Sequence, residues 1–146
     1  MAISYKVLNS VLPSIIDAKF PILIRGRHGI GKSTIVYQIA EQRGLPVVER
    51  RASQMTEGDL LGLPKVEGNV TQWLAPEWLH NACNNPVILF LDEVDRATME
   101  VRQGIFELCD SRKIAGYTLH EDTVIFACVN GGGDHGDQYQ VGEMDP

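Results

Sequence analysis

Residues 26–33, with the sequence Gly-Arg-His-Gly-Ile-Gly-Lys-Ser, constrain the fold of this chain more than any other segment. They match the pattern GxxxxGK[ST] at every fixed position. The apolar run 21–25 before them predicts a buried strand, and residues 33–43 after them predict a helix that ends at Gly44. Between a strand and a helix, such a loop turns its backbone N–H groups inward and adds the positive end of the helix dipole. The alternative, a flexible glycine turn beside a solvated lysine, requires a chance match, which average residue usage puts at about one in a hundred or less.

The pattern therefore predicts a nucleotide-phosphate site. Its expected binding residues are Gly26, Arg27, His28, Gly29, Ile30, Gly31, Lys32, Ser33 and Thr34. Lys32 is suited to neutralise charge on the β- and γ-phosphates, and the Ser33 hydroxyl is a hard oxygen ligand suited to Mg²⁺. His28 occupies a variable position of the pattern, where a loop-exposed imidazole is the simpler interpretation.

Two further polar groups follow apolar runs. Asp92 and Glu93 end the run 87–91, where Asp92 is placed to hold Mg²⁺ and Glu93 to activate a water for attack on the γ-phosphate. Asn130 follows the predicted strand 123–129, from which its amide can reach the attacking water or the γ-phosphate. In isolation these would be solvated acids at a strand end and a turn signal before glycines. With the phosphate loop present, we expect all three at one site.

The rest of the chain alternates strands and helices. Apolar periodicity predicts a helix at 4–18, in which Pro13 restricts or kinks the backbone, and further helices at 76–84 and 99–109. A second strand is expected at 47–50, and residues 53–75 are irregular, with a hairpin around Glu67, Gly68 and Asn69. This order predicts one α/β domain over 1–146 with a mainly parallel sheet.

Composition excludes several classes of protein. The chain has 146 residues, of which 44% are hydrophobic and 22% charged, values typical of a globular domain. The formal charge of -6 argues against a generic nucleic-acid-coating protein. The longest apolar runs are strand-sized, and no signal peptide is recognisable, so we expect a soluble cytoplasmic protein without membrane contact. Three widely spaced cysteines, Cys83, Cys109 and Cys128, fit buried thiols rather than a disulfide framework or a zinc site.

The three phosphate-site elements in this order resemble the AAA+ ATPases. Residues 57–64, Glu-Gly-Asp-Leu-Leu-Gly-Leu-Pro, look like the DLLG-x-P stretch of the MoxR-type branch. Residues 93–97 are similar to that branch's segment after the second acidic motif, except that Asp95 stands where an Asn often precedes the arginine. Arg112 matches the arginine that ends a helix of the group. The resemblance extends from about Ile22 to the end of the chain.

The resemblance implies a three-layer αβα sandwich of the P-loop NTPase fold and an ATPase that remodels or activates a partner protein. It also implies ATP and Mg²⁺ as cofactors and a ring of like subunits, usually a hexamer. In this frame Lys32, Glu93 and Asn130 are the catalytic residues, and Ser33 and Asp92 hold the metal. Arg96 and Arg112 would lie near the subunit interface, although solvated helix-end arginines are an equal alternative.

The chain departs from the family after Asn130. Its last residues, Glu-Met-Asp-Pro at 143–146, stand where a segment with an arginine finger, a fifth strand and a helical lid would begin. We therefore expect the last core strand and the lid to be missing, the edge strand at Ile22–Ile24 to be partly unpaired, and nucleotide binding to survive better than turnover. A companion protein could supply the missing parts.

Three other functions remain open. A nucleotide-binding or interaction module without turnover is the main alternative, and a small-molecule kinase or a DNA-directed motor is less favoured. A metal site at His135 with Asp134 and Asp137 is disfavoured because no second ligand cluster accompanies them. Trp73 and Trp78 are interpreted as packing groups rather than as a base-stacking platform.

Overall fold

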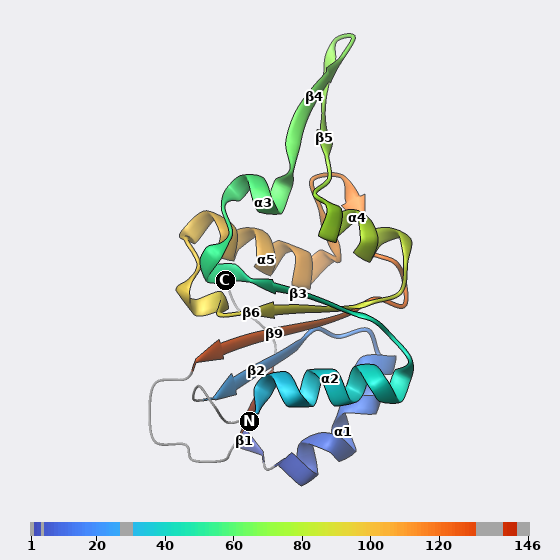
Figure 1. Ribbon diagram of the computed structural model, residues 1–146, viewed down its shortest axis with the longest axis vertical. Coiled ribbons are helices and arrows are strands. Elements are labelled where there is room, and N and C mark those ends of the chain that lie inside the picture. Colours follow the sequence, from blue (N-terminus) through green and yellow to red (C-terminus); the bar gives the residue numbers. More distant parts are fainter. Residues whose placement is uncertain (1, 4, 27–30, 131–138, 143–146) are drawn as a thin grey trace.

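The centre of the molecule is a six-stranded sheet, seen in the computed structural model, which describes residues 2–3, 5–26, 31–130 and 139–142 (Figure 1). The strands, in their order across the sheet, are β1 (Ala2–Ile3), β10 (Tyr139–Gly142), β2 (Ile22–Gly26), β9 (Val124–Asn130), β6 (Ile88–Asp92) and β3 (Val47–Arg51). The four neighbours β2, β9, β6 and β3 are parallel, and β10 and β1 add antiparallel pairs beyond β2. The predicted mainly parallel α/β sheet is confirmed.

Helices cover both faces of this sheet. Below it in the view of Figure 1 lie α1 (Tyr5–Asp17) and α2 (Lys32–Arg43), and above it lie α3 (Glu57–Leu61), α4 (Glu77–Asn84) and α5 (Met99–Ser111). Successive side chains of β6 point to opposite faces of the sheet, which explains the two layers. Ile88 and Phe90 join the cluster with α1 and α2, whereas Leu89 and Leu91 join the cluster with α3, α4 and α5. This arrangement confirms the three-layer αβα sandwich.

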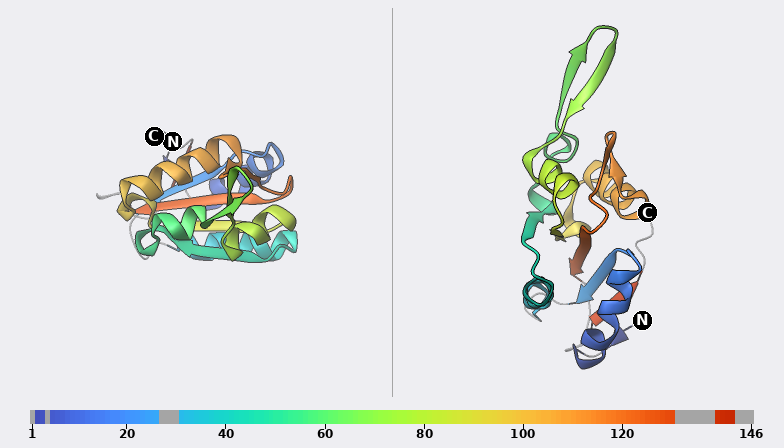
Figure 2. Two further views of the ribbon diagram at one scale, coloured as in Figure 1. Left: turned by 90° about the horizontal axis from the view of Figure 1, so that it is seen from above. Right: turned by 90° about the vertical axis from the view of Figure 1, so that its right-hand side faces the viewer.

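The predicted hairpin exists and protrudes from the sandwich. Its strands are β4 (Leu63–Glu67) and β5 (Val70–Leu74), and every residue of both strands is exposed. Figure 2 shows the hairpin well clear of both helical layers. Sequence analysis predicted that the segment before the hairpin is irregular. It instead contains the 3₁₀ turn η1 (Ala52–Gln54) and the short helix α3.

A capping box explains why α3 forms despite its shortness. The Thr56 side chain accepts the backbone N–H of Asp59, and the Asp59 carboxylate accepts the backbone N–H of Thr56. Two further short elements escaped sequence analysis. They are the 3₁₀ turn η2 (Val94–Arg96) and the small hairpin of β7 (Lys113–Ile114) and β8 (Tyr117–Thr118).

The expected unpaired edge at β2 is wrong. Strand β10 pairs antiparallel with it, with Val141 opposite Ile24 and Gln140 opposite Arg25. Strand β10 thus covers the β2 edge from Leu23 to Arg25, whose backbone groups an open edge would expose to other chains. The four-residue strand is too short to give a periodic signal in the sequence.

Side-chain burial agrees with most of the sequence interpretation. Trp78 is 7% exposed and donates its indole N–H to the Asp59 carbonyl at 2.6 Å, so its packing role is confirmed. Trp73 lies on the hairpin and is 37% exposed, so it lies outside the buried core. The cysteines are thiols as expected, and burial raises the pKa of the Cys109 thiol to about 12.

Among the described residues, no helix has the length and apolarity that crossing a membrane requires.

Candidate functional site

The predicted site residues meet where the parallel strands end. Gly26 closes β2 and stands opposite Asn130, which closes β9. Asp92 closes β6, and its neighbour in the sheet is Arg51 at the end of β3. Because all four strands run the same way, their carboxyl ends form one edge, at which open α/β sheets bind ligands. The structure therefore brings Lys32, Asp92, Glu93 and Asn130 to one edge of the sheet.

Lys32 is the best-defined group of this edge. It begins α2 after Gly31, whose φ of 87° is the left-handed conformation that glycine adopts without strain. Its side chain is only 9% exposed, and the ammonium donates to the Gly26 carbonyl at 2.8 Å, the Val129 carbonyl at 3.1 Å and the Asn130 Oδ1 at 2.8 Å. All three acceptors are neutral, and no carboxylate of the described residues forms a salt bridge with Lys32.

This arrangement fits an anionic ligand. A buried ammonium without a counter-ion is electrostatically costly, and a phosphate group would neutralise it. Ser33 and Thr34, which follow in the first turn of α2, are exposed and available to a ligand at the helix N-terminus. Four predicted phosphate-binding residues, Arg27, His28, Gly29 and Ile30, lie outside the described residues.

Asp92 and Glu93 occupy a tight turn after β6. Oδ1 of Asp92 accepts the backbone N–H of Glu93 at 2.8 Å, and Glu93 adopts a left-handed conformation with φ of 55°. Such a conformation is strained for a residue with a Cβ and is found preferentially at functional sites. The turn fixes the Asp92 carboxylate through one oxygen, and a carboxylate has a second oxygen for a hydrated cation. Together with the Ser33 hydroxyl, it supplies the hard oxygen ligands that Mg²⁺ prefers.

Two residues at this edge were missed in the sequence. Ser53, in η1, donates its hydroxyl to Oε2 of Glu93, and the Nε of Arg51 lies 3.8 Å from the same oxygen. The Glu93 side chain is 19% exposed, so its carboxylate is held at the sheet edge rather than left in solvent. The predicted strand at 47–50 stops just short of both residues: Arg51 is the last residue of β3, and Ser53 follows in η1. Their place in the site depends on β3 pairing with β6, because the ends of parallel strands converge.

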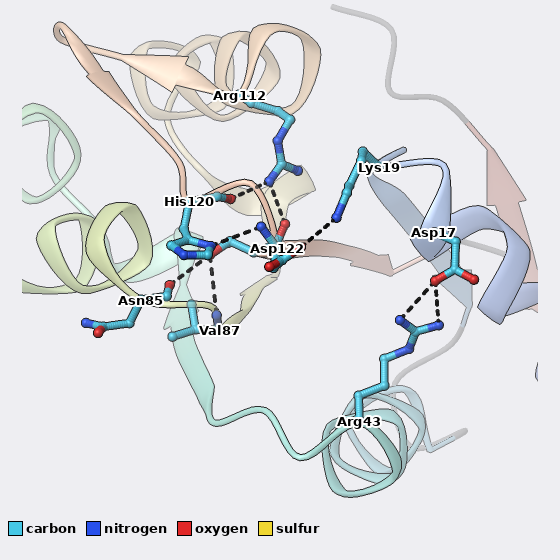
Figure 3. Close-up of polar contacts among 9 residues, drawn as sticks. Asp17, Lys19, Arg43, Asn85, Val87, Arg112, His120 and Asp122 are labelled. Carbon is cyan, nitrogen blue, oxygen red and sulfur yellow. Dashed lines mark hydrogen bonds and ion pairs between the residues drawn. The ribbon is translucent and has the colours of Figure 1, made fainter.

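The two candidate interface arginines lie in different places. Arg96 is exposed and ends η2, three residues after Glu93, at the same edge as the phosphate loop. Arg112 follows α5 and donates to the carbonyls of His120, at 2.8 Å, and Thr123, at 2.6 Å (Figure 3). Because Thr123 precedes β9 and Asn130 ends it, Arg112 lies at the opposite end of that strand from Lys32. Burial lowers the pKa of the Arg112 guanidinium. Its two carbonyl partners support a structural role within this chain, and an interface role for either arginine stays a prediction.

The alternative metal site is not built by the described part of the chain. Asp134, His135 and Asp137 lie outside the described residues. Within the residues that are described, no group of three or more His, Cys, Asp or Glu side chains could hold a metal ion.

A family comparison agrees with this geometry. The model of the family "AAA domain (dynein-related subfamily)" matches residues 21–126, which include Lys32, Asp92 and Glu93. The chain belongs to the dynein-related AAA domains. It is therefore an ATP-binding AAA+ ATPase domain.

Two curated relatives are both midasins. The chain is 35% identical to midasin of Giardia intestinalis over 94 residues, which is 64% of this chain, and 32% identical to midasin of Dictyostelium discoideum over 132 residues, which is 79% of it. Each match spans only 2% of the relative's length.

Solved structures share the fold. A candidate ATPase from Cytophaga hutchinsonii superposes with a TM-score of 0.62 at 19% identity and covers 94% of this chain and 42% of that one. A RuvB variant from Thermotoga maritima gives a TM-score of 0.60 at 14% identity and covers 88% and 40%. These similarities confirm the P-loop NTPase fold.

Proposed function

We propose that this chain binds Mg·ATP and hydrolyses it within a ring of like subunits, in the manner of a MoxR-like ATPase that remodels or activates a partner protein. The phosphates would lie on residues 26–34, with Lys32 on the β- and γ-phosphates. Ser33 and Asp92 would hold Mg²⁺, which would neutralise phosphate charge when bound. Glu93 would take a proton from the attacking water, and Asn130 would orient that water or the γ-phosphate.

One observation carries the proposal. The Lys32 ammonium is buried between the ends of β2 and β9 on neutral acceptors, with the Asp92–Glu93 turn on the next strand of the same edge. A structural lysine would be expected to meet a carboxylate at such a depth. A lysine at a helix N-terminus whose partners among the described residues are all neutral is instead arranged for a phosphate that arrives from solvent.

The first experiment tests binding. Lys32→Ala removes the buried cation and is expected to abolish ATP binding in titration calorimetry, because charge-assisted hydrogen bonds to phosphate are lost. Lys65→Ala is the matched control, since Lys65 lies on the exposed hairpin and pairs with Glu67. Unchanged ATP affinity in Lys32→Ala would show that the phosphate site is elsewhere.

The second experiment tests turnover. Glu93→Gln keeps the shape of the side chain but cannot accept the proton, so we expect ATP binding to persist and steady-state hydrolysis to be lost. Wild-type chain that binds ATP without measurable hydrolysis would support the alternative of a nucleotide-binding or interaction module. Transfer of phosphate to an acceptor other than water would instead indicate a kinase.

The third experiment tests assembly. Light-scattering mass with and without ATP is expected to increase with nucleotide if like subunits form a ring around it. A monomer under both conditions would contradict a ring formed by this chain alone.

A further inference from the structure

The end of β9 extends beyond the strand that it pairs with on one side. The ladder between β6 and β9 stops at Leu91 opposite Ala127, whereas β9 continues against β2 until Asn130 stands opposite Gly26. The reason is the turn at Glu93, where the chain leaves the direction of β6 and enters η2. At its end β9 has therefore lost the neighbour whose carbonyls would accept its N–H groups.

A side chain takes the place of the missing strand. The backbone N–H of Asn130 donates to Oδ1 of Asp95 at 3.3 Å. Asp95 lies in η2, two residues after Glu93, and the backbone bonds from Arg96 to Glu93, at 3.1 Å, and from Ala97 to Val94, at 3.2 Å, hold that turn together. Val94 is 1% exposed and anchors it in the core. The position of Asp95 is thus tied to that of Glu93.

The contact continues to the phosphate loop. While the backbone of Asn130 is held by Asp95, its side-chain Oδ1 accepts the Lys32 ammonium at 2.8 Å. Asp95, Asn130 and Lys32 therefore form a chain of contacts from η2 across the end of β9 to the first residue of α2.

From this geometry we infer that Asp95 is a positioning residue: its carboxylate replaces the absent β6 carbonyl and sets Asn130 in register with both Glu93 and Lys32. The inference rests on the proposed function, in which Glu93 takes a proton from the attacking water and Asn130 orients that water or the γ-phosphate. A displacement of about 1 Å between such groups can reduce a rate about a hundredfold. Asp95 itself need not touch the nucleotide.

The decisive pair of variants separates the acceptor from the charge. Asp95→Ala removes the acceptor oxygen, and Asp95→Asn keeps it in the same place without the charge. We expect Asp95→Ala to lower the hydrolysis rate about ten- to a hundredfold while ADP affinity changes by less than about threefold. Asp95→Asn is expected to stay within about threefold of the wild type. Asp110→Ala, an exposed aspartate of α5, is the control for loss of a carboxylate elsewhere.

A second measurement does not depend on activity. Amide hydrogen exchange, followed by NMR on the nucleotide-free full chain, should show the Asn130 N–H exchanging at least about tenfold faster in Asp95→Ala but not in Asp95→Asn or Asp110→Ala. An unchanged Asn130 exchange rate in Asp95→Ala would overturn the inference, and so would equal loss of hydrolysis in both Asp95 variants. If the wild type fails to bind ATP, the proposed function fails, while the exchange measurement still decides whether Asp95 holds Asn130.

Discussion

The centre of the sheet and the β4–β5 hairpin are both built from extended backbone, yet their surroundings are opposite. In β6, the residues from Ile88 to Leu91 are fully buried between two helical layers, and β9 is nearly as buried. In the hairpin, both strands are exposed on both faces, including Leu63 and Val66, which are 67% and 73% exposed. The same residue types therefore stabilise one region and contribute little to the other.

Different interactions stabilise the two regions. The central strands are held by apolar contact on both faces, which contributes about 1.5–3 kcal/mol for each large side chain. A two-stranded hairpin without a packed face is marginal in water. The hairpin is held by its root, where Gly62 approaches the Leu74 carbonyl and the Tyr117 hydroxyl donates to the Trp73 carbonyl.

The largest expected effect tests this contrast directly. Leu89→Ala opens a cavity beside α3, α4 and α5 and should reduce the free energy of unfolding by about 2–5 kcal/mol. Leu63→Ala makes the same chemical change on the hairpin and should change it by less than about 0.5 kcal/mol. Urea unfolding followed by circular dichroism measures both. Similar losses in the two variants would mean that the hairpin is packed in solution.

The next effect tests the root of the hairpin. A Cβ at Gly62 would lie 1.9 Å from the Leu74 carbonyl oxygen, and Gly62 has φ of 88°. Gly62→Ala should therefore destabilise the chain by about 1–3 kcal/mol and accelerate amide exchange along β4 and β5. Gly68→Ala, at the hairpin tip with φ of 59° and open space around it, is the matched control with backbone strain alone. An equal effect at both glycines would contradict the role of the root.

A smaller effect is expected from the hydrogen bond that joins the β7–β8 hairpin to the β4–β5 hairpin. Tyr117→Phe removes the hydroxyl that donates to the Trp73 carbonyl and should cost about 0.5–1.5 kcal/mol. Faster amide exchange near Leu74 is the sharper readout. Tyr37→Phe, which removes a hydroxyl from the exposed side of α2, serves as control. If both variants exchange like the wild type, this hydrogen bond does not order the hairpin.

The smallest effect concerns the cap of α3, which leads into the hairpin. Hydrogen bonds from the Thr56 backbone N–H and then from its hydroxyl hold the pKa of Asp59 below its ordinary value of 3.8. A carboxyl with a lowered folded-state pKa stabilises the fold above that ordinary value and loses this contribution as the pH falls through the lowered one. Asp59→Asn should thus be less stable than the wild type by about 0.5 kcal/mol at pH 6, and the difference should shrink below pH 3.8. A difference that stays constant with pH would contradict the cap.

Much of the fold could be predicted from the spacing of apolar residues and from the glycine-containing turns between them. The run 87–91 and the glycine loop after 21–25 led directly to β6 and β2, because buried parallel strands are uniformly apolar and the loop pattern demands a strand before it. The hairpin followed from Gly68 and Asn69 between alternating residues. Strand β10 and the turns η1 and η2 could not be predicted, since elements of three or four residues carry no period and depend on what they pair with.

The sequence identified the residues of the candidate site that would act directly on the nucleotide. Lys32, Asp92, Glu93 and Asn130 were expected at one place, and the structure puts them there. Ser53, Arg51 and Asp95 were not predicted as members of the site, because a serine, an arginine and an aspartate after short strands look like ordinary surface residues until the strand ends converge. The exposure of Trp73 was also missed, since the lack of Lys and Arg between Lys65 and Arg96 argued only against a base-stacking platform.

The sequence by itself determined the type of site. The glycine loop before a helix has the spacing and the lysine that phosphate binding requires. The apolar runs that end in acids or an amide predicted a layered parallel sheet. Only the tertiary structure decided the acceptors of the Lys32 ammonium, the partners of Glu93 and the support of Asn130 by Asp95. Apart from the bond between Lys32 and the Gly26 carbonyl, those contacts join residues 35 to 98 positions apart. Local propensity carries no information about which distant strand ends will meet.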